Sequence, residues 1–372
     1  MVLNAKNAMN IVCMIDYGES AGGAIRMLVW VANAMAAHGH HVQVCSCSHS
    51  KFLEGAVESP CEYHSFGAPD RNTRTKRTLF QECTLVASIC RHFKIVRPDI
   101  VISFGDHAFY YALMLKNVCH YKLVVSERAD PYHPRGKGDK VRRRLYNHCD
   151  AGVFQTEMAA RFFSPSFQDR STVIPNPVKI AFSDAWKPNK QKVVTSLSRI
   201  DFFQKRLDVL IRAFELVTVP DVTLRIYGTG PDNEVEKLKR LISNSSKSKY
   251  IKLMGAIDGP VRAFEGSSVY VLCSDFEGIP NTVIEALAYG IPVISTDTSP
   301  GGAKMLLDGG RYGQLVPCGD PAALAHAIDQ RFIDEGAFLK RAKAGRDSLQ
   351  RFEEDSINKQ WLSFLTHVEE EN

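Results

Sequence analysis

Short apolar runs alternate with helical patterns along almost the whole chain. The run NIVCMID (10–16) predicts a buried strand, and the segment after it (24–39) repeats apolar residues at helical spacing. The same alternation continues after three further strand candidates, at 99–105, 121–127 and 151–157. It predicts an α/β fold in which parallel sheets are covered by helices on both faces.

The alternation is interrupted once, within residues 171–199, and then starts afresh. Two prolines flank Asn176 in this segment, and such a loop is typical of a domain boundary. We therefore expect two doubly wound domains, residues 1–175 and 176–346. A C-terminal helix is expected at 347–372, where apolar residues again recur at helical spacing.

The length suggests two domains or one large barrel, and the composition is that of a soluble globular enzyme. The chain has 372 residues, 45% of them hydrophobic and 23% charged, and its net charge of +5 is too small to indicate a nucleic-acid partner. No apolar run approaches the length of a membrane span, and the start of the sequence shows no signal-type cleavage site, so we expect a cytoplasmic protein. The ten cysteines include no CxxC pair, so neither a zinc site nor a disulfide framework is indicated.

Positive charge is concentrated in the segment PRGKGDKVRRRLYNH, whose only acid is Asp139. Two interpretations stay open. The segment is either a solvated helix face, or a patch that contacts an anionic membrane surface or a diphosphate-bearing acceptor. Its bases are Arg135, Lys137, Lys140, Arg142, Arg143 and Arg144.

Ligands of open parallel sheets bind outside the carboxyl ends of the strands, so the loops after the strands are where chemistry is expected. The first such loop carries Gly18, Gly22 and Gly23 before a helix whose free amide groups favour an anion. A tight turn that needs glycine is the competing explanation. The spacing is not GxGxxG, which disfavours a dinucleotide cofactor.

Three cations follow the first strand of the second half. Arg199 ends the strand VVTSLSR, and Lys205 and Arg206 come at the start of the next helix. Together they form a plausible clamp for a diphosphate, in which arginine binds through its fork and lysine as a point charge. The alternative is a set of surface pairs with Asp201 and Asp208.

The stretch SDFEGIPNTVIEALAYG (274–290) places two acids near one strand end. Glu277 lies in the loop, where its carboxylate can accept hydrogen bonds from hydroxyl groups. Glu285 falls within a predicted helix, and Thr282 with Glu285 fits the S/T-x-x-E capping box, which is a purely structural explanation for this second acid.

The same stretch, extended to FEGIPNTVIEALAYGIPVIST, resembles the E-x7-E motif of retaining glycosyltransferases with the GT-B fold, in particular glycosyltransferase family four. Further segments match in the family's order along nearly the whole chain. They are GGAIRMLVWVANAMAAHGHHVQV, SERADPY, GVFQTEMAARFF, VIPNPV, SLSRIDFFQKRLDVLIRAF and DGGRYGQLVPCGDPAALAHAI. The resemblance implies two Rossmann-like domains with a cleft between them. It places the acceptor on the first domain and a nucleotide-sugar donor on the second, and it implies a last helix that crosses back to the first domain.

The resemblance also implies roles for individual residues. Glu277 would hold hydroxyls of the donor sugar and Glu285 the ribose, while Arg199 and Lys205 would neutralise the donor diphosphate. Cations placed in advance stabilise the charge of a departing nucleoside diphosphate, so no metal and no cofactor is expected. The donor-binding backbone is expected at Gly23, Gly228, Gly278, Ile279, Pro280, Asn281 and Thr282.

One segment departs from the family pattern. Many relatives place a histidine after the strand equivalent to KLVVSER, whereas Ser126, Glu127 and Arg128 stand there in this sequence. The SERxDP pattern resembles a subgroup that builds bacterial surface polysaccharide or lipid-linked oligosaccharide and often transfers a galactose-type or N-acetylgalactosamine-type sugar. Glu127, Arg128 and Asp130 are therefore candidates for acceptor or sugar contacts, with a buried salt bridge as the alternative. His107 is a lesser candidate, because a histidine beside aromatic residues is commonly just packed.

The expected function is retaining, metal-independent transfer of a sugar from a UDP-hexose or UDP-N-acetylhexosamine to a glycan or polyprenyl-linked acceptor in surface polysaccharide synthesis. The protein would act in the cytoplasm, peripheral at the inner face of the cell membrane. A phosphorylase or a sugar-nucleotide epimerase of the same fold is the first alternative. A non-catalytic sugar-nucleotide-binding protein is the second.

Overall fold

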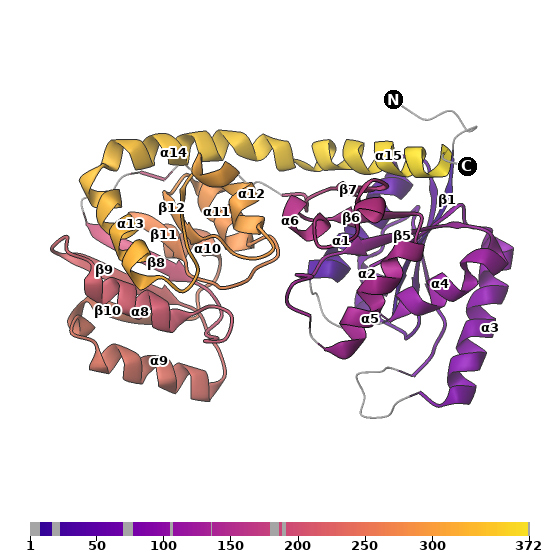
Figure 1. The fold of residues 1–372 in the computed structure, drawn as a ribbon, viewed down its shortest axis with the longest axis horizontal. Helices are drawn as coiled ribbons and strands as arrows, with labels where there is room; N and C mark the ends of the chain where they lie inside the picture. Colours follow the sequence, from indigo (N-terminus) through magenta and orange to yellow (C-terminus); the bar gives the residue numbers. More distant parts are fainter. Residues whose placement is uncertain are drawn as a thin grey trace. The chain divides into compact units, whose positions relative to one another are not determined.

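The chain folds into two compact units (Figure 1), the first formed by Met1–Asn176 with Asp355–Asn372 and the second by Pro177–Glu354. The structure is a computed structural model. It describes residues 8–16, 23–69, 77–104, 107–134, 136–178, 186–187 and 191–370.

The described part of the first unit contains a seven-stranded sheet in the order β3-β2-β1-β4-β5-β6-β7, with every neighbouring pair parallel. Its strands are β1 (Asn10–Ile15), β2 (His41–Ser46), β3 (Glu62–Ser65), β4 (Ile100–Ser103), β5 (Lys122–Glu127), β6 (Ala151–Phe154) and β7 (Ser171–Val173). Its helices are α1 (Gly23–Ala37), α2 (Lys51–Ala56), α3 (Leu79–Val96), α4 (Ala108–Cys119), α5 (Lys137–Leu145), η2 (Tyr146–His148), α6 (Glu157–Ala160), α7 (Pro165–Gln168) and α15 (Glu354–Glu370).

Strand β1 shows that both faces of this sheet are covered. Ile11 and Cys13 alternate with Val12 and Met14, and all four side chains are buried. Because successive strand residues point to opposite faces, the two pairs enter different cores. The first pair packs with residues of α1 and α15, and the second with residues of α3 and α4. An uninterrupted apolar run is what a parallel strand between two helical layers requires.

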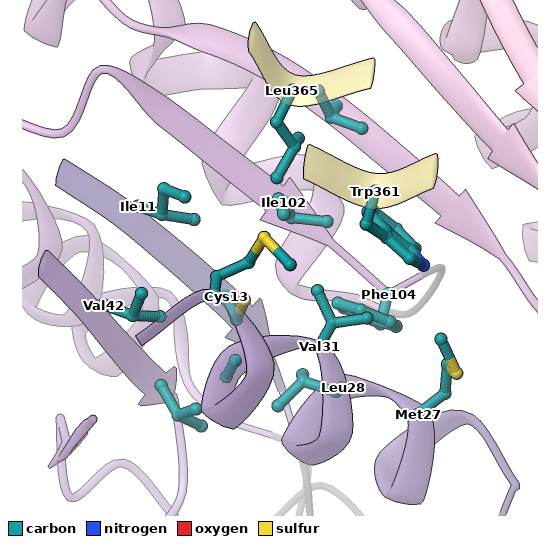
Figure 2. Close-up of a cluster of buried hydrophobic side chains, with 14 of the residues drawn as sticks. Ile11, Cys13, Met27, Leu28, Val31, Val42, Ile102, Phe104, Trp361 and Leu365 are labelled. Carbon is teal, nitrogen blue, oxygen red and sulfur yellow. The ribbon is translucent and has the colours of Figure 1, made fainter. Parts of the chain in front are cut away.

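The last helix, α15, is part of the core of the first unit. Ile357, Trp361, Leu365 and Val368 recur at helical spacing and are all buried there. Figure 2 shows Trp361 and Leu365 pointing from this helix into the cluster that also holds Phe104. The stripe of α15 thus completes one face of the sheet instead of facing water.

The C-terminal helix is shorter than the pattern over 347–372 predicts. The preceding helix runs on to Ser348, a 3-10 turn follows at Leu349–Phe352, and Glu353 is extended with φ −60° and ψ 148°. Leu349 and Phe352 are buried in a core of the second unit. The apolar spacing read as one helix therefore belongs to two elements that pack in different units.

The described part of the second unit holds a six-stranded parallel sheet in the order β10-β9-β8-β11-β12-β13. Its strands are β8 (Lys192–Leu197), β9 (Val222–Tyr227), β10 (Ile251–Gly255), β11 (Val269–Leu272), β12 (Val293–Thr296) and β13 (Gln314–Val316). Its helices are α8 (Leu207–Leu216), α9 (Asp232–Asn244), η3 (Ser248–Tyr250), α10 (Pro260–Phe264), α11 (Asn281–Tyr289), α12 (Gly302–Leu306), η4 (Asp308–Gly310), α13 (Pro321–Ile333), α14 (Glu335–Ser348) and η5 (Leu349–Phe352).

Two separate cores cover the two faces of the second sheet. Leu210 of α8 and Ile328 of α13 lie in one core, and Ala263 of α10 and Leu287 of α11 lie in the other. The two sheets also share one strand order, so the predicted α/β class with two doubly wound units is confirmed. In the described part of the chain, none of the helices combines the length and apolarity needed to cross a membrane.

Candidate functional site

The strand order of the second unit creates a switch point between β8 and β11. These strands are hydrogen-bonded neighbours, with Val194 opposite Val269 and Thr195 opposite Tyr270. The chain leaves β8 toward β9 on one side and leaves β11 toward β12 on the other. In such sheets the loops after the two strands separate and leave a crevice in which ligands bind. The candidate cations follow β8 and the candidate acids follow β11.

The loops after β8 and β11 are joined by backbone and amide hydrogen bonds. The Asp275 N–H donates to the Gln204 carbonyl at 2.9 Å, and the Gln204 side-chain amide donates to the Phe276 carbonyl at 3.0 Å. Gln204 was not singled out in the sequence. It holds the cation-bearing loop against the acid-bearing loop.

Lys205 and Glu277 form an ion pair at this junction. The Lys205 ammonium contacts Glu277 Oε1, which also accepts a hydrogen bond from Ser274 Oγ at 2.6 Å. The Gln204 amide donates to the second carboxylate oxygen at 3.3 Å. Only 16% of the Lys205 side chain and 11% of the Glu277 side chain are exposed, so the pair is well shielded from water. Both residues were predicted site residues, and the structure brings them together.

The two arginines of this loop are held differently. The Arg206 guanidinium binds Asp275 at 2.6 Å and Asp208 at 3.2 Å, and these two carboxylates raise its pKa. Arg199 donates to Asp201 at 2.8 Å, but 62% of its side chain is exposed. The surface ion pairs with Asp201 and Asp208, which were the alternative to a diphosphate clamp, therefore exist. Since an exposed pair contributes little, Arg199 can exchange Asp201 for a ligand anion at small cost.

Two glycines allow the site loops to approach each other closely. A Cβ atom on Gly228, which has φ +140°, would lie 1.8 Å from the Ser198 carbonyl oxygen. A Cβ atom on Gly302 would lie 1.7 Å from the Gly278 carbonyl oxygen. No side chain fits at either position. The loops after β9 and β12 are thereby packed directly on those that carry the cations and the acids.

The loop after β12 contributes two hydroxyl groups that the sequence analysis missed. The Glu277 N–H donates to the Ser299 carbonyl at 2.8 Å, so this loop borders the acid-bearing one. Thr298 Oγ1 and Ser299 Oγ are buried and have no hydrogen-bond partner within the described ranges. Buried hydroxyls without partners are rare, and they mark this loop as a candidate for ligand contacts. The sequence STDTSPGG after a strand was the only available signal.

Helix α11 begins without the predicted capping box. Pro280 is its N-cap residue and no side chain caps it. Thr282 lies inside the first turn and accepts a hydrogen bond from the Tyr270 hydroxyl at 2.6 Å. The structural explanation for Glu285 is therefore wrong. Of the predicted cradle Gly278, Ile279, Pro280, Asn281 and Thr282, the last two open α11. Among the described residues no side chain caps this end, so their N–H groups form a positive end suited to an anion.

Glu285 is the least committed acid of the site. It lies in α11, half-buried, and burial raises the pKa of its carboxyl from 4.5 to about 7. Neither a hydrogen bond nor an ion pair joins it to another residue in the described part of the chain. A partly buried carboxyl without a partner costs stability, which favours a role in binding.

The first-unit candidate Glu127 lies in a buried network. Its carboxylate accepts hydrogen bonds from Arg143 at 3.2 Å, from the Tyr146 hydroxyl at 3.1 Å and from the Ala129 N–H at 3.1 Å. The side chain is only 2% exposed. These contacts favour the structural alternative, a buried salt bridge, over a sugar contact.

Arg128 is partly buried, and among the described residues no carboxylate forms a direct ion pair with it. It donates to Ser126 Oγ at 2.8 Å and to the Ile174 carbonyl at 3.0 Å, and it lies 5.6 Å from the centre of the Trp361 ring. Burial lowers its pKa, and Nη2 has no hydrogen-bond partner. Asp130 accepts from the Tyr132 N–H at 2.9 Å and contacts His133.

The remaining first-unit candidates are less informative. His107 precedes α4, with its ring 5.0 Å from that of Tyr110 and 6.0 Å from that of Tyr111. This is the packing beside aromatic residues that was the simpler expectation. Gly23 is the first residue of α1. Arg135 lies outside the described residues.

The basic segment is divided by the fold. Arg143 is buried and Arg142 is mostly buried, because they turn toward Glu127 and Asp139. Lys140 and Arg144 are exposed. The hypothesis of one patch made by all the bases of this segment is therefore wrong for Arg142 and Arg143, which form internal ion pairs instead.

No group of three His, Cys, Asp or Glu side chains in the described ranges is arranged to hold a metal ion. The site that the structure does assemble consists of cations, acids and amide groups. Cations and amide N–H groups bind phosphate, and carboxylates accept hydrogen bonds from hydroxyl groups. The site therefore suits a ligand that carries both phosphate and hydroxyl groups.

Two family models match the chain, one in each unit. Residues 21–182 match the family described as Glycosyltransferase Family 4. Residues 191–334 match the family described as Glycosyl transferases group 1. The second match contains all the switch-point residues.

Two curated relatives are similar to the chain over nearly their full length. An uncharacterized glycosyltransferase of Haemophilus influenzae is 24% identical over 354 residues, 93% of this chain and 97% of that protein. An alpha-1,4-N-acetyl-D-galactosaminyltransferase of Campylobacter jejuni is 25% identical over 369 residues, 94% of this chain and 96% of that protein. Its name gives GalNAc-alpha-(1->4)-GalNAc-alpha-(1->3)-diNAcBac-PP-undecaprenol as its substrate.

Solved structures share the fold. Anabaena HepE in complex with UDP superposes with a TM-score of 0.78 at 20% identity, over 96% of this chain and 100% of that chain. The apo form of the lipopolysaccharide outer core galactosyltransferase WaaB gives a TM-score of 0.77 at 19% identity, over 96% and 99% of the two chains. These matches confirm the predicted GT-B architecture.

Proposed function

Because the chain is a glycosyltransferase with the GT-B fold, we propose that it transfers a sugar from a UDP-sugar to a glycan or lipid-linked acceptor, with retention of the anomeric configuration. The observation that carries the proposal is the ion pair between Lys205 and Glu277 at the switch point, together with Glu285, which forms no hydrogen bond or ion pair with another described residue. Lys205 suits the diphosphate of such a donor, Glu277 the sugar and Glu285 the ribose.

In this proposal the residues of the second unit bind the donor. Arg199 and Lys205 face the diphosphate together with the open N–H groups at the start of α11. Glu277 accepts hydrogen bonds from sugar hydroxyls, and Glu285 accepts them from the ribose. When the diphosphate binds, it attracts the Lys205 ammonium and frees one oxygen of Glu277 for the sugar. Ser274 keeps the carboxylate in place during this exchange.

The proposed chemistry is transfer on a single face of the sugar. The acceptor oxygen bonds to the anomeric carbon on the side from which UDP leaves, and the acceptor proton passes to a phosphate oxygen of the leaving group. Negative charge develops on the diphosphate, where the cations and N–H groups stabilise it most. In this arrangement, protein cations and N–H groups stabilise the negative charge that a metal ion would otherwise stabilise.

The nature of donor and acceptor is supported by the relatives. HepE was solved with UDP and with UDP-glucose, WaaB is a galactosyltransferase, and the Campylobacter protein is an N-acetylgalactosaminyltransferase that acts on a diphospho-undecaprenol glycan. We infer a galactose-type hexose or N-acetylhexosamine as the donor sugar and surface polysaccharide as the product class. Such an acceptor would place the protein at the inner face of the cell membrane.

Removal of divalent metal should leave the reaction unchanged. With excess EDTA, the initial rate of UDP release should stay within about twofold of its value in magnesium, because protein cations neutralise the diphosphate. A coupled assay of UDP release measures this directly. A loss of about tenfold or more, restored by magnesium, would show that the diphosphate needs a metal.

Donor affinity should increase as the pH rises through about 7, because the ribose hydroxyls bind the ionised form of Glu285, whose pKa burial raises to about 7. A UDP-sugar is the suitable ligand, since its diphosphate is esterified at both ends and does not titrate in this range. Calorimetry at about pH 6 and about pH 8 should show weaker binding and proton release at the lower pH. Glu285→Gln should abolish this pH dependence; a variant that keeps it would assign the titration to another group.

The function itself is tested by supplying purified protein with a series of UDP-sugars and a membrane lipid extract. Transfer predicts UDP release that requires the extract, and an α-linked product from an α-linked donor by NMR. Release or conversion of the sugar nucleotide without an acceptor would favour the epimerase alternative. Activity that depends on free phosphate would favour the phosphorylase, and UDP-sugar binding without turnover the non-catalytic protein.

A further inference from the structure

A hollow of 370 Å³ lies on the first unit, and none of the residues assigned to the donor is among its described lining residues. One wall is the segment that follows β5, and α5 with η2 and the residues after α6 form the rest of the lining. Because the carboxyl end of a parallel strand is where ligands bind, this is a suitable place for a second substrate. Its lining residues are Pro131, Tyr132, Pro134, Lys140, Arg143, Arg144, Asn147, Phe162, Phe163 and Ser164.

The charge of the hollow is entirely positive. None of its described lining residues is acidic. Lys140 and Arg144 are four positions apart on α5, which places them on one face of the helix. Both are exposed, and within the described ranges neither makes a hydrogen bond or an ion pair. Two unpaired cations one helical turn apart favour an anion that can contact both.

The hollow is preformed, because Arg143 joins α5 to the segment that follows β5. Its guanidinium donates to the carbonyls of Pro131 at 3.2 Å and Asp130 at 3.1 Å, and it is paired with Glu127. All three donor nitrogens are thereby used inside the protein. Arg143 thus holds the wall in place, while Lys140 and Arg144 remain available to a ligand.

The hollow also has an apolar side. Tyr132 and Phe162 pack edge to face, 5.2 Å between ring centres at 84°, yet they are 41% and 42% exposed. Met158, whose carbonyl accepts a hydrogen bond from the Tyr132 hydroxyl, is 41% exposed. Exposed apolar side chains that gather beside unpaired cations mark a surface that a ligand covers.

We infer that this hollow binds the phosphate or diphosphate group of a lipid-linked acceptor, with the first part of the lipid chain on the Tyr132 and Phe162 rings. The inference rests on the proposed function and specifies its acceptor class. Free phosphate would leave the aromatic side unused. A neutral glycan would leave Lys140 and Arg144 without partners. A phosphate group joined to an apolar chain uses both halves of the hollow.

The test is calorimetry of the full-length protein with farnesyl diphosphate, inorganic pyrophosphate and farnesol as probes. Wild-type protein should bind farnesyl diphosphate at least about tenfold more tightly than pyrophosphate, because the chain adds apolar burial. Lys140→Ala with Arg144→Ala should weaken farnesyl diphosphate binding at least about tenfold. Phe162→Ala should weaken binding of farnesyl diphosphate but not of pyrophosphate. The matched control is Arg91→Ala with Lys94→Ala, which removes two exposed charges from α3 and should change nothing.

Several results would overturn the inference. Equal losses of farnesyl diphosphate affinity in the test and control variants would mean that the net charge of the protein, and not the position of Lys140 and Arg144, determines binding. Equal affinity for pyrophosphate and farnesyl diphosphate would assign the hollow to free phosphate. Flotation of the wild type with phosphatidylglycerol vesicles, unaffected by farnesyl diphosphate, would assign it to the general membrane surface. UDP affinity, measured on the same wild-type sample, tests the proposed function separately, so failure of one leaves the other standing.

Discussion

Replacing Lys205 by alanine should lower kcat for sugar transfer by about 10²–10³-fold, the loss typical when one preorganised group is removed from a developing negative charge. Lys205 is shielded and contacts Glu277 directly, so its removal also leaves that acid partly buried without its cation. Glu277→Ala should cost about as much. Steady-state assays of UDP release, with circular dichroism to verify folding, measure both losses.

The two substitutions should be strongly non-additive. If Lys205 and Glu277 act as a unit, the double variant is expected to be little worse than either single one. Lys239 and Glu236 provide a matched control, because they form an exposed pair at 2.8 Å on α9 of the same unit. Their alanine variants should retain normal turnover. Additive losses at 205 and 277, or normal turnover in either single variant, would contradict the assignment.

Trp361→Ala should destabilise the protein by about 3–5 kcal/mol, as large aromatic truncations in cores do. The ring is fully buried in the first unit, and it also packs against the Arg128 guanidinium. Its loss leaves a cavity under α15, next to the Arg128 guanidinium. Urea unfolding followed by circular dichroism gives the change in the free energy of unfolding.

The control for this substitution is Phe80→Ala on α3, where the aromatic side chain is 80% exposed. It should change the free energy of unfolding by no more than about 0.5 kcal/mol. If Trp361→Ala were as mild as Phe80→Ala, α15 would not be an integral part of the first core. The residues from 355 onward would then be dispensable for the stability of that unit.

The alternation of strands and helices made the fold predictable, because a parallel strand buried on both faces has an apolar run that is easily recognised. The predicted strand at 10–16 corresponds to β1, and the segment of helical spacing at 24–39 corresponds to α1. Strand order was not readable in this way. The meeting of Lys205 with Glu277 depends on β8 lying next to β11, a pairing of segments about 70 residues apart in the chain that local patterns do not encode.

Helix boundaries were less predictable where single residues decide them. Helix α8 starts at Leu207, later than its apolar pattern suggests, because Arg206 adopts the left-handed conformation with φ +47°. Pro280 as the N-cap of α11 moves Thr282 into the helix and removes the capping box. The sequence therefore identified both acids of the site, but its structural alternative for Glu285, the capping box, is not formed.

The basic segment shows a different limit of sequence reading. Helical spacing identifies which residues share a face, but not which face turns inward. Arg142 and Arg143 turn inward because Glu127, about 15 residues earlier, is brought beside them by β5. Only the structure separates these internal cations from Lys140 and Arg144. The structure thus replaces the hypothesis of one continuous basic patch by a defined hollow, whose ligand can be tested.

The central claim is that the switch-point loops of the second unit bind a nucleotide-sugar, and titration of UDP into the full-length protein at about pH 8 tests it most directly. The account predicts one UDP per chain with a dissociation constant on the order of 1 μM to 1 mM, and at least about tenfold weaker binding by Glu285→Ala. Absence of UDP binding by the wild type, or equal affinity of the two proteins, would contradict it.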